Sequence, residues 1–199
     1  MLSSGTRFVR LTGTVLVLGL ALVAVSCGKK DETSEKAAES IPPPPAAMAA
    51  LTDANIAAIV LAANDADIAN GNVAKDKTKN KEVRAFAVRM ITDHNAVNKQ
   101  ASDLAKQLSL SPEDNDASKG LKASADSTRE EIKKLDGAAF DKAYIDNEVA
   151  YHTAVIGMLD GTLIPGATNA DLKTLLTTTR PAFQAHLEHA QKVQASLSK

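Results

Sequence analysis

Apolar residues in most of the chain recur at alternating spacings of three and four, the pattern of a helix that packs one face against its neighbours. The clearest stretch spans residues 83–108. Its apolar face reads Val83, Ala87, Met90, His94, Val97, Ala101, Leu104 and Leu108. Every position on that face is apolar except His94. The pattern therefore predicts a long helix with one histidine on its buried side.

The stretch before it gives a less regular pattern. A first helix is expected to start near residue 53, with Thr52 or Asp53 as its cap. Two faces compete for the core. One contains Asp67 and reads Ile56, Val60, Ala63, Asp67, Asn70, Ala74; the other reads Ile59, Ala62, Ala66, Ala69, Val73. Poor helix formers such as Asn64 and Gly71 make this the least regular of the predicted helices.

Three more helices follow. An accessory helix is expected to begin at Ser111-Pro112-Glu113 and to end at residues 136–137. The next should span about 138–159 and bury His152, and residues 161–166 should form a loop. The last, capped by Thr168 or Asn169, should bury His186 and be kinked or restarted by Pro181. No stretch alternates with the period of a strand, so the expected fold is all-α: a bundle of four long helices with one accessory helix.

Four polar residues interrupt the apolar faces: Asp67, His94, His152 and His186. Each falls about 14 to 17 residues into its helix, or roughly 21 to 26 Å along the axis. In helices of similar length this depth is close to mid-height, whichever way each helix runs. The four residues should therefore form one layer, and bundle cores are where such folds build metal sites.

Three imidazoles and a carboxylate suit one transition-metal ion: zinc, iron, manganese or copper. Met90, one turn from His94, adds a hint towards copper. Glu148, His189 and Asp93 are candidates to support the ligands, because each lies beside one of them in the sequence. Two alternatives remain open. The polar residues can form a hydrogen-bonded network without metal in a structural or stress-related protein, or the site can serve a redox enzyme.

The first 50 residues predict targeting rather than fold. Arg7 and Arg10 precede an apolar stretch at residues 11–25, which is short for a membrane span. It ends in Ala24-Val25-Ser26-Cys27, a pattern that resembles a bacterial lipobox with Cys27 as the lipidated residue. Ordinary secretory cleavage is the alternative. The expected division is a signal peptide at 1–26, a lipidated, proline-rich tether at 27–50 and a helical domain at 51–199.

The net charge and the residues around Cys27 limit which partners and which cellular location the sequence predicts. The formal net charge is −1, which gives no reason to expect a nucleic-acid partner. Lipidated Cys27 would make the membrane the partner, and the following Gly28 favours the outer membrane, with the domain facing the periplasm. The sequence has no glycine-rich phosphate loop, CxxC or GxSxG motif, so it predicts no particular reaction.

Three sequence elements are similar to a known family. They are Met90-x-x-Asp93-His94 within residues 83–94, Phe140-Asp141-x-x-Tyr144 leading to His152, and Pro181 leading to His186. Over residues 54–193 the chain resembles a bacterial ferritin-like family of unknown function labelled "predicted outer membrane protein". The resemblance implies a ferritin-like bundle in an envelope protein. That family often has a glutamate where this chain has Asp67.

The resemblance does not imply the di-iron chemistry of ferritins. A ferritin-like di-iron site takes carboxylates from its helices together with two Glu-x-x-His pairs. Glu148 and His152 are four residues apart rather than three, so neither pair is present. The sequence therefore predicts a histidine-rich site for a single metal ion, or a metal-free network, and not an iron store.

Overall fold

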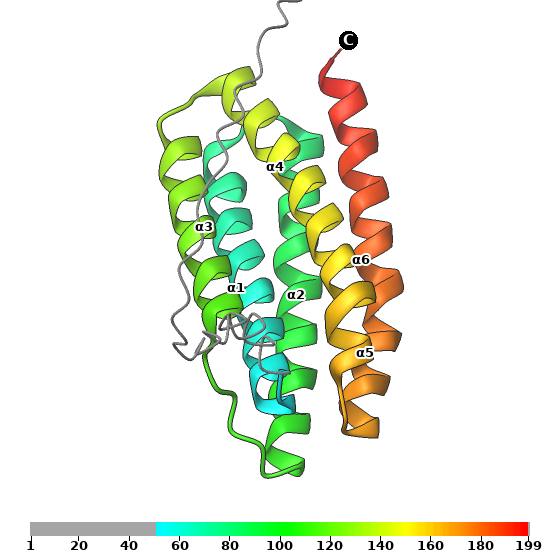
Figure 1. Ribbon diagram of the computed structural model, residues 1–199. Coiled ribbons are helices and arrows are strands. Elements are labelled where there is room, and N and C mark those ends of the chain that lie inside the picture. Colours follow the sequence, from blue (N-terminus) through cyan, green and yellow to red (C-terminus); the bar gives the residue numbers. More distant parts are fainter. Residues whose placement is uncertain (1–50, 199) are drawn as a thin grey trace, which may run out of the picture. The chain divides into compact units, whose positions relative to one another are not determined.

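The computed structural model describes residues 51–198, which form an all-α bundle. Five long helices pack together (Figure 1): α1 (Asp53–Lys77), α2 (Lys81–Gln107), α3 (Asp116–Lys133), α4 (Gly137–Met158) and α6 (Ala170–Leu197). A π-helical turn, η1 (Leu159–Leu163), and a short helix, α5 (Ile164–Gly166), join α4 to α6. This confirms the predicted all-α class. No helix in the described range is long and apolar enough to cross a membrane. The targeting segment and Cys27 lie outside the described residues.

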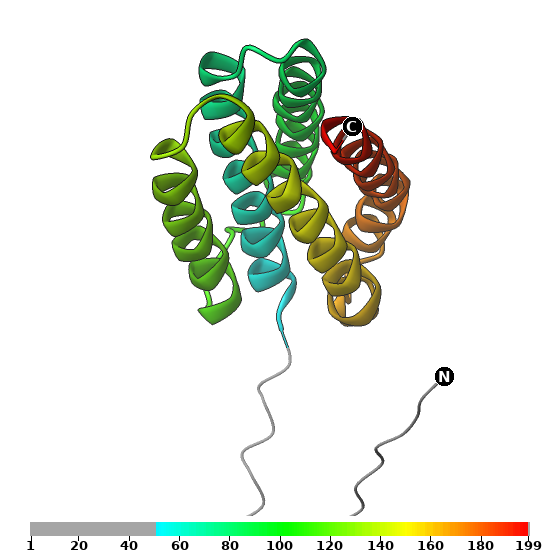
Figure 2. The same cartoon turned by 90° about the horizontal axis from the view of Figure 1, so that it is seen from above.

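The helices form two hairpins joined by a crossover. α1 packs along α2 and α4 packs along α6, and these are the two most extensive helix pairs. α3 lies mainly against α1 and carries the chain from the end of α2 back to the opposite end of the bundle, where α4 begins (Figures 1 and 2). As a result α2 and α4 run in the same direction, and α1 and α6 run in the opposite one.

Polar caps at the helix starts fix these positions. Thr52 caps α1 as predicted, accepting a hydrogen bond from the backbone N–H of Asn55 at 3.1 Å. Asn169 caps α6. The start of α6 is tied to the start of α1, because the Asp53 carboxylate accepts hydrogen bonds from the backbone N–H groups of Thr168 and Asn169. The two hairpins are thus joined at one end of the bundle.

The predicted start of α3 at Ser111-Pro112-Glu113 is wrong. α3 begins four residues later, at Asp116, with Asn115 instead of Ser111 as its cap. The reason is that residue 113 pairs with α1 instead: its backbone N–H donates to the Ala54 carbonyl at 3.0 Å. Asn115 and Ser118 then form a reciprocal capping box, which is a stronger start signal than a proline in the first turn. α3 also ends sooner than expected, at Lys133, and Gly137 is the first residue of α4.

α1 is a single regular helix in spite of its poor helix formers. Both of the faces that compete in its sequence are buried, including Ile56 on one and Ile59 on the other. α1 lies between α2 and α3 and also touches α4, so it has no wide solvent face. Tertiary packing therefore outweighs the low propensity of Asn64, Gly71 and their neighbours.

Two further expectations are corrected near the end of the chain. Residues 161–166 are not an open loop, because α4 continues into the π-turn and α5. α6 does not restart at Pro181; it runs as one helix from Ala170 to Leu197 with the proline on its exposed side. Leu176 and Phe183, on either side of the proline, are both buried, and their packing holds the helix together across the missing N–H.

The core has two apolar halves. One is built around Ile56, Ile59, Val155, Leu176 and Phe183, and the other around Phe86, Met90, Phe140, Tyr144 and Val193. In each of α1, α2, α4 and α6, one or two buried acidic or histidine residues stand between the residues of the two halves: Asp67, His94, Glu148 with His152, and His186. The predicted polar layer is thus present at mid-height of the bundle.

Candidate metal centre

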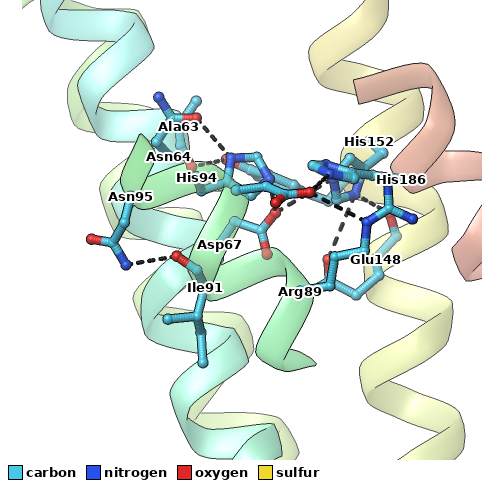
Figure 3. A network of polar contacts seen from close by, with 12 residues as sticks. Ala63, Asn64, Asp67, Arg89, Ile91, His94, Asn95, Glu148, His152 and His186 are labelled. Atoms are coloured by element: carbon cyan, nitrogen blue, oxygen red, sulfur yellow. Dashed lines mark hydrogen bonds and ion pairs between the residues drawn. The ribbon is translucent and has the colours of Figure 1, made fainter. Parts of the chain in front are cut away.

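The polar layer brings together side chains from four helices (Figure 3). α1 supplies Asp67, α2 supplies His94, α4 supplies both Glu148 and His152, and α6 supplies His186. All five side chains are buried, with exposed fractions of 2% or less. Burying this many ionisable groups costs stability unless the groups satisfy one another or a bound ion. The contacts among these five side chains therefore decide what the layer can do.

The three histidines form the first group that can hold a metal ion. One ligand-capable atom from each of His94, His152 and His186 lies within 4.8 Å of those of the other two. Their ring centroids are 5.2 to 5.7 Å apart. The ring of Phe183 packs edge-on against His94, at 5.1 Å between centroids, and covers the group from the apolar half of α6. The structure thus brings together the three histidines singled out in the sequence.

Each histidine has one ring nitrogen held by an oxygen. Nδ1 of His94 lies 2.7 Å from Oδ1 of Asn64, Nδ1 of His152 lies 2.9 Å from the carbonyl oxygen of Glu148, and Nε2 of His186 lies 2.8 Å from Oδ2 of Asp93. An oxygen acceptor places the ring proton on the nitrogen that faces it. The opposite nitrogens then carry lone pairs, and none of them has a hydrogen-bond partner among residues 51–198. Outer acceptors of this kind orient histidine ligands in metal sites.

Asp67 lies against two of these nitrogens. Its Oδ2 is 2.7 Å from Nε2 of His94 and 3.4 Å from Nε2 of His152. Despite these short distances, neither carboxylate oxygen makes a correctly directed hydrogen bond within the described part of the chain. Atoms that are close without pointing at each other have the arrangement of ligands around a common ion. Asp67 therefore fits the ligand set predicted from the sequence.

Glu148 belongs to a second group. With Asp67 and His152 it offers three ligand-capable atoms within 4.8 Å of one another, and its Oε2 is 3.6 Å from Nδ1 of His152. From the sequence, Glu148 was expected only to support the ligand His152 and not to bind the metal itself. Its full burial and its contact with both residues make it a potential ligand as well. The two groups share His152, so they describe one connected site and not two separate ones.

Burial sets the charges in the layer. Desolvation lowers the pKa of His186 to about 4, although the hydrogen bond to Asp93 acts to raise it. Desolvation also lowers the pKa of His152, although the charge of Asp67 acts to raise it. Desolvation would raise the pKa of Asp67, but His94, His152 and Glu148 together hold it below its usual range. Desolvation and the neighbouring Asp67 charge raise the pKa of Glu148 well above its usual range. His152 and His186 are thus neutral at neutral pH, as metal ligands must be.

Asp93 and His189 differ in their relation to the site. Asp93 accepts a hydrogen bond from Nε2 of His186 and is itself held by Nε of Arg89 at 3.3 Å, so it supports His186 on α6 and not its sequence neighbour His94. His189 joins neither metal-capable group of the described residues. Its ring lies about one turn further along α6 than His186 and packs against Phe86, at 5.1 Å between centroids.

Asn64 is the residue that the sequence analysis missed. It is fully buried and holds His94, yet in the sequence it counted only as a poor helix former. A signal was present, because Asn64 lies three residues before Asp67 and so shares its face of α1. Met90, considered as a soft ligand, is fully buried in the apolar half of the core with Phe86.

Fold and site together define a class: an all-α bundle with a buried layer of histidines and carboxylates that could hold a metal ion. Residues 38–193 match the model of the family described as "Domain of unknown function (DUF4142)", and because the match covers most of the chain, the chain belongs to that family. The expected membership of a family of unknown function is confirmed. No curated protein and no solved structure matches the chain.

Proposed function

We propose that this protein binds one transition-metal ion in the middle of its helical bundle. The ligands are the inward-facing nitrogens of His94, His152 and His186 and the Asp67 carboxylate. One observation carries the proposal: three buried imidazoles each have one nitrogen against an outer oxygen, and one ring nitrogen of each lies within 4.8 Å of those of the other two. A lone histidine in a core is ordinary, whereas three that converge in this way are typical of a metal site.

The ligand set narrows the choice of metal. Three imidazoles and a carboxylate suit tetrahedral zinc, and ferrous iron, manganese and copper accept imidazole as well. A zinc ion with bonds of about 2.1 Å spaces its ligand atoms about 3.4 Å apart. Asp67 Oδ2 is already 3.4 Å from His152 Nε2. The ligand atoms of the three histidines lie up to 4.8 Å apart, and Asp67 Oδ2 is only 2.7 Å from Nε2 of His94, so metal binding requires side-chain rotations that close the first distances and widen the second. Glu148 can add an oxygen for an ion that prefers more than four ligands.

The decisive measurement is metal content. The protein is purified without a histidine tag, loaded in turn with zinc, iron, manganese and copper, and analysed by mass spectrometry of the metal. We expect one ion per chain, and loss of that ion in His94→Ala. His189→Ala is the matched control, because His189 lies on the same bundle but outside the site, and it should keep its metal. No stoichiometric metal under any loading condition would refute the proposal.

The alternative is a metal-free network. If the Asn64 amide is turned so that its nitrogen faces Nδ1 of His94, the ring proton moves to Nε2, which can then donate to Asp67 2.7 Å away. The unpartnered Asn64 Nδ2 favours this arrangement. In that case His94→Ala loses stability while metal binding is absent from the parent protein as well. Metal analysis and thermal unfolding of the same two proteins therefore separate the two possibilities.

The order of the helices supports a ferritin-like arrangement, which we include in the proposal. Ferritin-like bundles join two helical hairpins through one long crossover, and α3 has that position here between α2 and α4. We do not extend the proposal to ferroxidase or storage activity. The candidate ligands contain more histidine than carboxylate, and the Glu-x-x-His pairs of a di-iron site are missing.

We also propose that the protein works in the bacterial envelope, facing the periplasm from the outer membrane. The support is the lipobox-like sequence ending in Cys27, followed by Gly28. Lipidation of Cys27 would make the membrane a partner through acyl chains. Mass spectrometry of the mature N-terminus tests this. We expect an acylated cysteine in the membrane fraction, and a protein released to the soluble fraction by Cys27→Ala. An unmodified Cys27 would refute the anchor.

A further inference from the structure

A mostly apolar groove lies between α3 and α4. α3 packs on α1 and touches α4 at few points (Figure 2). A groove of about 260 Å³ remains between α3 and α4, with Asn70 of α1 on its floor. Its walls are mostly apolar and include Leu121, Ala125, Val155 and Met158. None of the candidate metal ligands lines it. The groove is therefore separate from the metal centre.

Two amides at this groove lack partners. Asn70, on the floor, is only 3% exposed, and its Oδ1 accepts no hydrogen bond within residues 51–198. Asn147, on the α4 wall, has a buried Nδ2 that makes no well-directed hydrogen bond within residues 51–198, although the amide lies near enough to Glu148 to act against the raised pKa of that carboxyl. A buried polar atom without a partner is costly. Here an acceptor and a donor of this kind border the same apolar space, so the pair itself points to a ligand.

The chemistry of the groove limits what it can bind. A hydroxyl group can donate to the Asn70 oxygen and accept from the Asn147 nitrogen at the same time. The described lining contains no charged side chain, which disfavours an ionic ligand. The volume lies just below the usual range for ligand pockets, so it suits one ring or a short chain. We propose that the groove binds a small, uncharged and mainly apolar molecule through a single hydroxyl group.

The test compares two probes that differ in one hydroxyl. Binding of 4-propylphenol and of propylbenzene to the full-length protein is measured by NMR chemical-shift titration. We expect the phenol to bind at least ten-fold more tightly, with the largest shifts at Asn70 and Asn147. Asn70→Leu should remove this preference and leave propylbenzene binding within two-fold. His94→Ala, which targets the metal centre, should leave the binding of both probes unchanged.

Surface variants keep the test independent of folding. Ala150 is exposed and lines the mouth of the groove, so Ala150→Phe should block both probes without disturbing the core. Ala123→Phe is the matched control, because Ala123 is exposed on α3 outside the groove. Equal affinity for the two probes, no binding at millimolar concentration, or unchanged binding in Ala150→Phe would each overturn the proposal. Loss of phenol binding in His94→Ala would assign the phenol to the metal centre and overturn it too.

Discussion

His186 should make the stability of the metal-free protein depend on pH. Its side chain is 2% exposed, and burial lowers its pKa from 6.5 to about 4. Between these two values the unfolded chain binds a proton that the folded chain excludes. Stability is therefore lost as the pH falls below 6.5, and the loss is complete near pH 4. His152, whose pKa is also lowered by burial, acts in the same direction.

The size of the effect follows from the shift. Lowering the pKa of His186 from 6.5 to about 4 corresponds to a total loss of roughly 3 kcal/mol in the free energy of unfolding as the pH falls. About 2 kcal/mol of this loss falls between pH 7 and pH 5. Glu148 opposes this trend, because its raised pKa stabilises the folded state at low pH. The contribution of His186 must therefore be isolated by a variant. His186→Gln suits this purpose, since its amide nitrogen can still donate to Asp93 while it does not titrate.

The assay is urea unfolding of both proteins at pH 7 and pH 5 with a chelator present. We expect the unmodified protein to lose about 2 kcal/mol more than His186→Gln over this interval. The chelator is needed because metal release on acidification would add to the same trend. Parallel losses in the two proteins would refute the assignment of a buried, neutral His186. A larger loss in the variant would refute it as well.

Three other predictions test the packing and the charges of the site. Gly120→Ala should raise the free energy of unfolding by about 1 kcal/mol, because its new Cβ meets no atom within 4 Å. Gly71→Ala should give no gain, because its Cβ would lie 3.1 Å from Ile91. Equal gains in urea unfolding would contradict the tight contact between α1 and α2. Asp93→Ala should weaken metal binding about 10- to 100-fold in a competition titration while the ion-to-chain ratio at saturation stays the same. Glu148→Gln should make the metal-free protein more stable at pH 8, because burial and the Asp67 charge raise the pKa of this carboxyl in the folded state only, which costs stability at high pH; unchanged stability there would contradict the raised pKa.

The sequence was most informative on α2, because that helix packs with one face only. Its alternating apolar positions put His94 on the buried side, and the structure has His94 at 1% exposure there. The same reasoning placed His152 and His186, since a polar residue within an apolar stripe is buried together with its apolar neighbours. Equal depth along helices of similar length then gave the common layer without knowledge of helix direction.

α1 resisted this reasoning because it is buried on more than one side. Helical periodicity identifies the buried face only when another face is exposed to solvent. In α1 both apolar faces are buried, so periodicity could not select one of them as the core face. For the same reason the sequence pattern did not indicate clearly that Asn64 is buried next to His94. The start of α3 failed for a different reason. It depends on the long-range bond from residue 113 to Ala54, which no local capping rule contains.

The balance of donors and acceptors in the layer favours a cation over a purely structural network. With their outer nitrogens donating to oxygens, the three histidines keep only lone pairs on their other ring nitrogens, and two of these, Nε2 of His94 and of His152, lie against the Asp67 carboxylate, which also only accepts. Protonated histidines could supply the missing positive charge, but burial lowers the pKa of both His152 and His186. Turning the Asn64 amide provides one N–H to Asp67 and still leaves the inward nitrogens of His152 and His186 unmatched. The raised pKa of Glu148 adds one proton beside Asp67 but leaves the inward nitrogens of His152 and His186 unmatched, whereas a metal ion would accept both nitrogens and the Asp67 carboxylate as ligands.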